Sequence, residues 1–236
     1  MKIQDSVALV TGANRGLGLA FAKALLAGGA RKVYAAARDP ASVTLPGVVP
    51  IALDVTNAEQ VAAAARECGD VTLLVNNAGI SRSSGFLGER TLDALRAELD
   101  TNFYGPLLTT RAFAPVLARH GGGAIVNVLS ALSWVNMPAF GTYSATKSAA
   151  WSMTNGLRHE LRGQGTQVLG LHVAFMDTDM ARGAQGPKAH PDDVVAQVLA
   201  ALEAGREEVL ADVITRQVKQ GLAAEPGVYL SLPGGA

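Results

Sequence analysis

Short apolar runs rich in Val, Ile and Leu alternate along the chain with longer Ala- and Leu-rich segments. Most short runs are apolar throughout, which is typical of strands buried on both faces of a parallel sheet. The longer segments repeat their apolar residues at helical spacing and therefore predict helices. The expected strands span residues 7–11, 32–36, 48–53, 73–76, 124–129, 167–173 and 208–210, and the expected helices span residues 17–28, 57–67, 91–101, 103–119, 142–162 and 191–203.

This alternation of strand and helix indicates an α/β fold. It predicts a doubly wound parallel sheet of about seven strands with helices on both faces. No repeat, low-complexity tract or linker interrupts the pattern, so we expect residues 1–236 to form a single domain. Ligands of such sheets bind at the carboxyl ends of the strands, which is where candidate chemistry is expected.

Composition narrows the possible functions. Hydrophobic residues make up 49% of the 236 residues and charged residues 17%, which predicts a compact globule. Lys plus Arg and Asp plus Glu are 20 each, so the balanced charge argues against nucleic-acid and membrane partners. The apolar runs are too short to span a membrane, and we expect a cytoplasmic protein. Cys68 is the only cysteine, and the four histidines are scattered, so no metal site is expected.

The first strand leads into the segment Thr11-Gly12-Ala13-Asn14-Arg15-Gly16-Leu17-Gly18 and then into a helix. Glycines at these positions allow a tight turn and close approach of the backbone to a ligand. The free amide groups at the start of the helix suit a pyrophosphate. The spacing is GxxxGxG, and the alternative is a turn that simply needs glycine.

Polar residues also follow the third and fourth strands. Asp54, followed by Val55, could accept a hydrogen bond from an adenine amino group, or it could cap the helix that starts near Asn57. Asn76 and Asn77 precede Ala78 and Gly79, whose small size suits close approach of a ribose or nicotinamide. The paired asparagines could equally satisfy loop backbone.

The fifth strand ends near Ser130, and Tyr143 and Lys147 follow at steps of 13 and 4 residues. A four-residue step places Tyr143 and Lys147 on one face of a helix. A nearby ammonium, together with the positive ring of an oxidised nicotinamide, would lower the pKa of the phenol and make it useful in acid–base catalysis. Ser130 would hold the same substrate oxygen. The alternative is an exposed tyrosine and lysine on a helix face.

Together these motifs resemble the short-chain dehydrogenase/reductase family, in its branch of about 250 residues. The matching segments are TGANRGLG at 11–18, LDV at 53–55, NNAG at 76–79, Asn102 in DTNFYG, NVLS at 127–130 and YSATK at 143–147, in the family's order. The resemblance implies a Rossmann-type fold and a nicotinamide-dependent oxidoreductase that acts on a small carbonyl or alcohol substrate.

The resemblance also implies a role for each matching residue. Tyr143 resembles the catalytic acid/base, Lys147 the group that lowers its pKa and holds the nicotinamide ribose, and Ser130 the residue that positions the carbonyl. Asn102 resembles the asparagine of the proton relay, although its side chain could instead satisfy backbone at a helix kink before Gly105-Pro106. The implied cofactor-binding residues are Gly12, Asn14, Arg15, Gly16, Leu17, Gly18, Arg38, Asp54, Val55, Asn76, Ala78, Gly79, Tyr143, Lys147 and Thr178.

The sequence departs from the family pattern after the sixth strand. Thr178 matches, but Ala174-Phe175 stands where the family usually has Pro-Gly. The segment up to Pro191 is short and polar, where relatives usually carry a longer helical lid. We therefore expect an open substrate cleft, or one completed by the C-terminal part of the chain, where residues 213–224 are a candidate amphipathic helix.

The end of the second strand predicts the choice of cofactor. NAD-selective members of the family place an acidic residue there, whereas this chain has Ala37 followed by Arg38. A guanidinium can bind the 2′-phosphate of NADP(H), and Arg15 could supply a second one. A shift of the strand end by one residue would instead make Asp39 the ribose-binding acid and reverse the prediction.

The function predicted from these features is that of an NADP(H)-dependent carbonyl reductase or alcohol dehydrogenase. The alternative is a non-catalytic dinucleotide-binding redox sensor on the same fold. Small residues on two helices also predict a homodimer or homotetramer. The first face comprises Ala145, Ala149, Ser152 and Gly156, and the second Leu107, Thr110, Ala114 and Leu117.

Overall fold

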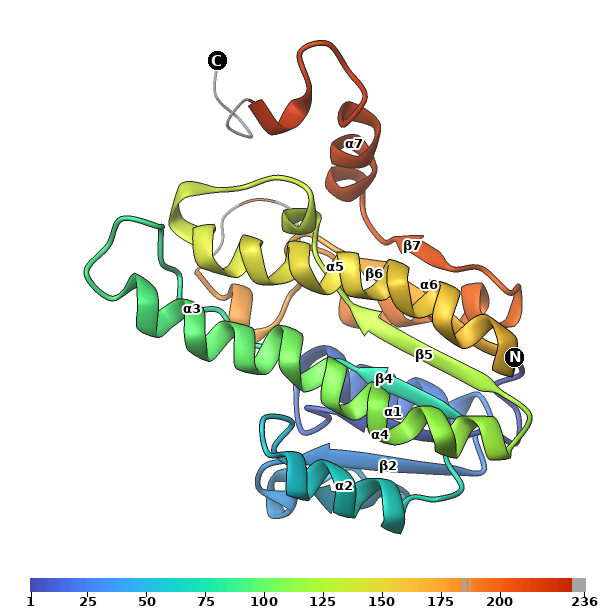
Figure 1. The fold of residues 1–236 in the computed structure, drawn as a ribbon. Coiled ribbons are helices and arrows are strands. Elements are labelled where there is room, and N and C mark those ends of the chain that lie inside the picture. Colours follow the sequence, from blue (N-terminus) through green and yellow to red (C-terminus); the bar gives the residue numbers. More distant parts are fainter. Residues whose placement is uncertain (184–185, 187, 231–236) are drawn as a thin grey trace.

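A seven-stranded, entirely parallel sheet forms the centre of the protein, as a computed structural model shows for residues 1–183, 186 and 188–230 (Figure 1). The strands lie in the order β3-β2-β1-β4-β5-β6-β7, so the chain reverses direction across the sheet between β1 and β4. This confirms the predicted doubly wound fold. The strands are β1 (Val7–Thr11), β2 (Lys32–Ala37), β3 (Val49–Ala52), β4 (Leu73–Asn76), β5 (Gly123–Val128), β6 (Thr166–His172) and β7 (Glu208–Leu210).

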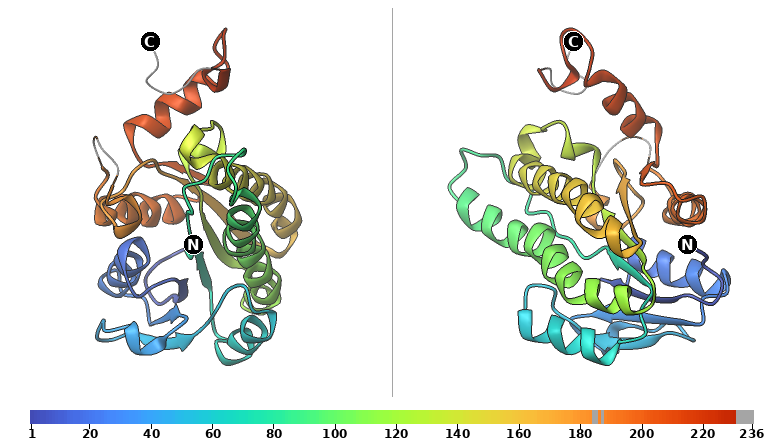
Figure 2. Two further views of the ribbon diagram at one scale, coloured as in Figure 1. Left: turned by 90° about the vertical axis from the view of Figure 1, so that its left-hand side faces the viewer. Right: turned by 45° about the vertical axis from the view of Figure 1, so that its right-hand side comes forward.

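Helices cover both faces of the sheet (Figure 2). One apolar cluster joins α1 and α6 to the sheet, and a second joins α2, α4 and α5 to the opposite face. The strands supply alternate side chains to each cluster, which is why most of their positions are apolar. The helices are α1 (Gly16–Ala27), α2 (Ala58–Glu67), α3 (Thr91–Leu99), α4 (Gly105–Arg119), α5 (Gly141–Leu161), α6 (Pro191–Glu203) and α7 (Val213–Gly221).

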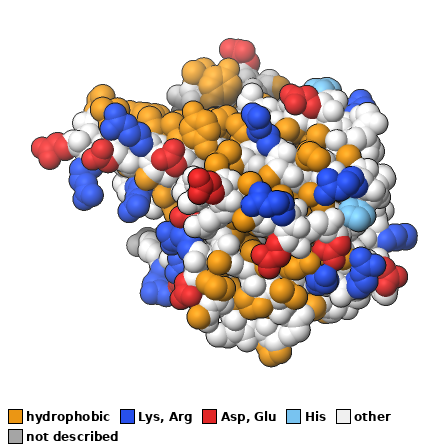
Figure 3. All heavy atoms as spheres, turned by 60° about the horizontal axis from the view of Figure 1, so that its bottom comes forward, with side chains coloured by type: hydrophobic (Ala, Val, Ile, Leu, Met, Phe, Trp, Pro, Cys, Tyr) orange, Lys and Arg blue, Asp and Glu red, His pale blue; other side chains and the backbone are white. Residues whose placement is uncertain are grey.

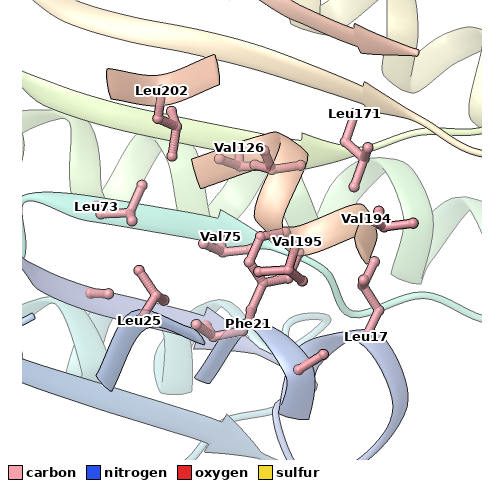
Figure 4. Close-up of a cluster of buried hydrophobic side chains, with 14 of the residues drawn as sticks. Leu17, Phe21, Leu25, Leu73, Val75, Val126, Leu171, Val194, Val195 and Leu202 are labelled. Carbon is pink, nitrogen blue, oxygen red and sulfur yellow. The ribbon is translucent and has the colours of Figure 1, made fainter. Parts of the chain in front are cut away.

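The first cluster fixes α1, and with it the glycine segment, against the sheet. Phe21 and Leu25 of α1 meet Val75 of β4 and Val195 of α6, and all four side chains are buried (Figure 4). Leu17, from the first turn of α1, also points into this core. Burial of this kind stabilises by about 25 cal/mol per Å² of apolar surface, so the start of α1 has little freedom to move.

A buried network of amides and hydroxyls lies between the sheet and the helices α4 and α5. Asn76 and Asn127 are register partners on β4 and β5, and the Asn76 amide nitrogen donates to the Asn127 oxygen over 2.9 Å. Thr109 of α4 donates to the Asn76 oxygen over 2.7 Å, and Asn127 donates to Thr154 of α5 over 3.0 Å. Asn76 also donates to Thr110. The network therefore ties two strands to both covering helices.

The two helices expected at 91–101 and 103–119 form one continuous rod through a π-helical segment, Asp100–Tyr104. Pro106 has no N–H to donate to the carbonyl of Asn102, so the regular helical bond is missing there. Gly105 donates instead to the carbonyl of Asp100, which widens the turn. Sequence interpretation placed a kink at this point, and the structure shows a wide turn without a break.

Helix α7 and the turn after it project from the body beyond the β7 edge, as Figures 1 and 2 show. None of the helices described by the structure is long and apolar enough to cross a membrane. On the face shown in Figure 3, acidic and basic side chains are interspersed. Within the second predicted small-residue face, Thr110 and Leu117 are buried inside the protein, so that prediction is wrong at these two positions.

Candidate active site

The glycine segment turns sharply between β1 and α1. Gly12 and Gly16 adopt φ values of +64° and +53°, a region that side-chain-bearing residues rarely occupy. A Cβ atom at Gly18 would lie 2.2 Å from the carbonyl oxygen of Gly12, so only glycine allows α1 to pack this closely on the turn. The three glycines thus have the separate conformational and packing roles expected from the sequence.

Asn77 and Thr11 hold this turn in place. The Asn77 amide donates to the carbonyls of Thr11 and Gly12 over 2.8 and 3.2 Å, and the Thr11 hydroxyl accepts the N–H groups of Asn77 and Ala78. The sequence alone does not predict the role of Thr11. For Asn77, the structure shows the alternative named for the paired asparagines, because its side chain satisfies loop backbone. Asn76 instead points into the buried polar network.

The start of α1 offers unpaired amide groups. Arg15 occupies the N-cap position without a side-chain cap, and no acidic residue lies in the first turn. Leu17 is buried in the core, so only its backbone can face a ligand, while Asn14 is half-buried on the turn. A bare helix N-terminus beside a glycine turn is suited to bind a pyrophosphate. This bare helix start beside the glycine turn, here called the cradle, fits the pyrophosphate of a dinucleotide.

Ser130, Tyr143 and Lys147 come together beside this cradle. Ser130 follows β5, and its hydroxyl is near enough to Tyr143 to lower the pKa of the phenol. The Lys147 ammonium donates to the carbonyl of Val128 over 2.8 Å and lies 5.6 Å from the centre of the Tyr143 ring. A Cβ at Gly79 would be 3.8 Å from the Lys147 nitrogen, which places the NNAG turn against the same group.

Burial dominates the ionisation of this group. It raises the pKa of Tyr143 above its ordinary value, although the nearby Ser130 hydroxyl acts in the opposite direction. Burial also lowers the pKa of Lys147 to about 8, so its ammonium form still prevails at neutral pH. The sequence predicts a lower pKa for Tyr143 from the combined effect of Lys147 and the positive ring of a bound nicotinamide. In the protein without cofactor, burial has the larger effect on this pKa.

Asn102 satisfies backbone at the wide turn. Its side chain accepts the N–H of Ile80 and donates to the carbonyl of Ile80, each over 2.9 Å, and it donates to Thr146 over 3.1 Å. Thr146 in turn donates to the carbonyl of Tyr143. The backbone-satisfying role weighed from the sequence is therefore present, and it connects the segment after Gly79 to the helix of Tyr143.

The end of β2 leaves Arg38 free beside the cradle. The strand ends at Ala37, and the Asp39 carboxylate accepts the N–H of Ala41 to cap a short 3-10 helix. Arg38 is exposed and forms no ion pair with the residues that the structure describes. The strand boundary thus agrees with the sequence interpretation, and Asp39 is engaged in capping.

Asp54 and Val55 lie after β3 with distinct contacts. One oxygen of Asp54 accepts from the backbone and hydroxyl of Thr56, while Asn57 caps α2. Val55 is buried, and a Cβ at Gly105 would lie 2.8 Å from it. The capping role considered for Asp54 thus belongs to Asn57, and Asp54 stabilises the turn before it.

The unusual Ala174 donates its N–H to Asp212 over 2.7 Å, and the same carboxylate caps α7. A proline at this position could not donate, so the departure from the family pattern is linked to how the C-terminal helix docks. Thr178 lies across from the glycine turn, 3.4 Å from where a Cβ of Gly16 would be. Arg15 forms an exposed ion pair with Asp179 over 3.6 Å.

Behind Ser130, the imidazole of His172 faces the Ser130 carbonyl over 3.1 Å and stacks on Trp134 at 3.9 Å between ring centres. Burial lowers the pKa of His172 to about 4, so the ring is neutral near pH 7. Lys219 of α7 lies 4.6 Å from the Trp134 ring centre. The C-terminal helix therefore contacts the loop after Ser130.

Comparison with protein families shows a match to the short chain dehydrogenase model over residues 6–188. A solved short chain dehydrogenase from Burkholderia cenocepacia, in complex with NADP, is 45% identical with a TM-score of 0.92, and the match covers 96% of each chain. A short chain dehydrogenase/reductase from Burkholderia phymatum, in complex with NAD, is 26% identical with a TM-score of 0.86 over the whole of both chains.

Among characterised relatives, a galactitol 2-dehydrogenase (L-tagatose-forming) from Cereibacter sphaeroides is 38% identical over 191 residues. The match covers 76% of this chain and 74% of that protein. The family model spans both the glycine turn and the Ser130, Tyr143 and Lys147 group.

Proposed function

The chain belongs to the short-chain dehydrogenase/reductase family, and we propose that it interconverts a ketone or aldehyde and the corresponding alcohol with NADP(H) as its cofactor. The observation that carries this proposal is the meeting of Ser130, Tyr143 and Lys147 beside the glycine turn. A redox sensor without turnover would not need this acid–base group.

Each residue of the group has a defined task in this reaction. The bound cofactor supplies or accepts the hydride. Tyr143 donates its phenolic proton to the carbonyl oxygen during reduction and takes it back from the alcohol during oxidation. The Ser130 hydroxyl holds the same oxygen, and the Lys147 ammonium stabilises the phenolate left after proton transfer. In the reduction, one hydride and one proton therefore convert C=O to CH–OH.

The direct test is turnover. Purified protein is incubated with NADPH and a panel of aldehydes and ketones, and with NADP⁺ and a panel of alcohols that includes polyols, and absorbance of the reduced cofactor is followed. Consumption or formation of NADPH with any substrate supports the enzyme. Tight cofactor binding without turnover on the whole panel would favour the sensor instead.

Arg38 supports the preference for NADP(H). Its free guanidinium stands next to Ala37, where no carboxylate repels a 2′-phosphate, and Asp39 is engaged in capping. Arg15 is a second, weaker candidate because it already pairs with Asp179. That exposed pair contributes only about 0–1 kcal/mol, so Arg15 can leave it to bind a phosphate.

We expect Arg38→Ala to weaken NADPH binding by about 10- to 150-fold, the value of a lost charge-assisted bidentate contact. NADH binding should change little, because NADH lacks the phosphate. Titration calorimetry with both cofactors measures this. Ala37→Asp is the complementary variant, and it should turn the preference towards NADH. Equal losses for both cofactors in Arg38→Ala, or a clear preference of the unmodified protein for NADH, would contradict the assignment.

We also propose that the protein is a homodimer or homotetramer that pairs through α5. Ala145, Ala149, Ser152 and Gly156 are not buried within the chain, and a Cβ at Gly156 would meet no atom within 4 Å. Small residues at these steps allow two helices to approach closely.

Gly156→Arg should therefore separate the subunits, because it places a long charged side chain in the interface while fitting the isolated chain. Light scattering at micromolar concentration should show a mass of about one chain for the variant and a multiple of it for the unmodified protein. Gly163→Arg is a matched control, since Gly163 is equally open but lies outside α5. A monomeric unmodified protein would refute the idea.

A further inference from the structure

His172 ends β6 and is a completely buried titratable residue that the proposed reaction does not use. Its Nδ1 atom lies 3.1 Å from the carbonyl oxygen of Ser130, and its ring stacks on that of Trp134 with the two planes 17° apart. A carbonyl oxygen only accepts hydrogen bonds, so this contact is favourable only when Nδ1 carries a hydrogen.

The surroundings of the second ring nitrogen lead to the same tautomer. Nε2 lies 3.7 Å from a carboxylate oxygen of Glu208, beyond hydrogen-bonding distance, and that oxygen already accepts from Lys219 over 3.1 Å. The shorter contact therefore places the hydrogen on Nδ1 and leaves Nε2 unpartnered among the described residues. An unpaired buried acceptor costs about 1–3 kcal/mol, so packing alone does not account for a histidine here.

The contact with His172 holds one end of a peptide group. The carbonyl of Ser130 and the N–H of Ala131 belong to the same planar unit. This N–H donates to the carbonyl of Val173 over 3.1 Å, while the carbonyl faces His172. Two consecutive residues, at and just after the end of β6, thus fix both ends of the peptide and with it the backbone from which the Ser130 side chain projects.

The other contacts of Ser130 are local. Its hydroxyl oxygen accepts the N–H of Leu132 over 3.1 Å, and its N–H donates to the hydroxyl of Ser133 over 3.2 Å. The first bond uses the hydroxyl oxygen as an acceptor and leaves its hydrogen available to a substrate oxygen. Leu132 and Ser133 belong to the same short turn and move with Ser130, whereas His172 is part of the sheet. The direction of the hydroxyl therefore depends on how this turn is attached to β6.

We propose that His172 is a positioning residue for the reaction, whose Nδ1–H holds the carbonyl of Ser130 and thereby directs the Ser130 hydroxyl at the substrate oxygen. This inference rests on the proposed function, in which Ser130 binds that oxygen. Loss of a whole donor to the reacting oxygen costs about 100- to 1,000-fold in kcat, and a donor that is present but misplaced loses part of this contribution.

The test compares two substitutions that separate the N–H donor from the ring. His172→Phe keeps a ring that can stack on Trp134 and removes the donor. His172→Asn removes the ring but carries an amide nitrogen as many bonds from the backbone as Nδ1. We expect kcat to fall about tenfold in His172→Phe, with NADPH affinity within about twofold, and we expect His172→Asn to recover most of this loss.

A purely structural role would give the opposite order, because phenylalanine preserves the apolar packing that asparagine removes. That order, equal losses in the two variants, or normal kcat in a folded His172→Phe would overturn the proposal. His120→Phe is the matched control. His120 also contacts a backbone carbonyl, that of Gly69 over 3.0 Å, but it is exposed at the end of α4 remote from Asn102, so kcat should be unchanged.

A double-variant cycle tests whether the effect passes through Ser130. In a Ser130→Ala background the hydroxyl is absent, so His172→Phe should change the residual kcat by less than about twofold. A similar loss in both backgrounds would mean that His172 acts on another group, and the proposal would be wrong. If His172→Phe does not fold, as circular dichroism would show, His172→Met removes the N–H at similar volume and takes its place in both comparisons.

A further measurement does not need a substrate. Nitrogen NMR of the isotope-labelled protein near neutral pH distinguishes protonated from unprotonated ring nitrogens, and the signals of His172 are those lost in His172→Asn. We expect a protonated Nδ1 and an unprotonated Nε2, and the opposite tautomer would overturn the inference. If the expected tautomer is found and no substrate turns over, the His172 contact stands and the proposed function fails. If substrate turns over and His172→Phe keeps normal kcat, the inference about His172 fails and the proposed function stands.

Discussion

Tyr143→Phe should reduce kcat by at least about 100-fold, the usual contribution of a positioned acid–base group, while NADPH binding stays within about twofold. The substitution removes one hydroxyl and leaves the ring in its place beside Lys147 and Ser130. The proton needed by the carbonyl oxygen would then come from solvent, without a donor of fixed position. Steady-state kinetics on an active substrate, together with a fluorescence titration of NADPH, measures both quantities.

Tyr104→Phe is the matched control, because Tyr104 is half-exposed on the π-helical segment and its hydroxyl makes no hydrogen bond to a described residue. It should retain normal kcat. Near-normal turnover in Tyr143→Phe would mean that another group transfers the proton, and the assignment of Tyr143 would have to be abandoned.

Gly18→Ala should disrupt the cofactor cradle. The new Cβ would lie 2.2 Å from the Gly12 oxygen and 2.6 Å from the Asn77 amide nitrogen, and both atoms are held by the turn, so α1 must shift. We expect the free energy of unfolding to fall by about 1–3 kcal/mol, as in other overpacked sites. The affinity for NADPH should fall at least about tenfold, because the amide groups at the start of α1 move with the helix.

Denaturant unfolding and calorimetric titration of NADPH measure these two effects. Gly163→Ala adds the same methyl group where no atom lies within 4 Å, and it should change neither. If Gly18→Ala bound NADPH as tightly as the unmodified protein, the glycine turn would not be the site that holds the pyrophosphate.

The sheet was predictable because its central strands are buried on both faces. Buried runs such as those at β1 and β4 are mostly apolar, and their order then follows from the rules of parallel α/β connections. Element boundaries differ from the prediction where a particular residue, rather than the apolar pattern, determines the backbone hydrogen bonding. The expected break near residue 102 became a π-helical turn, because the missing N–H of Pro106 changes the bonding without ending the helix.

The proximity of Tyr143 and Lys147 was predictable because their spacing is local: the two residues are one helical turn apart on α5. The supporting contacts were not, since they join residues distant in sequence. Asn77 holds Gly12, and Asp212 holds Ala174. The burial of Glu98 was unexpected for a different reason. A charged residue among leucines indicates a solvent-exposed position, whereas this side chain is completely buried and accepts the N–H of Arg82.

The buried network around Asn76 and Asn127 has a consequence for how the chain reaches its fold. Apolar strands can slide past one another at little cost, since a valine packs almost as well against one neighbour as against the next. Sliding β5 along β4 by one residue would separate the two asparagines and strand their amides, each worth about 1–3 kcal/mol, away from water. A sheet with β5 in the wrong register is therefore destabilised, and the chain is not held in that state during folding. The same few polar atoms, near the carboxyl ends of β4 and β5, select the alignment of these strands on which the geometry of the candidate site depends.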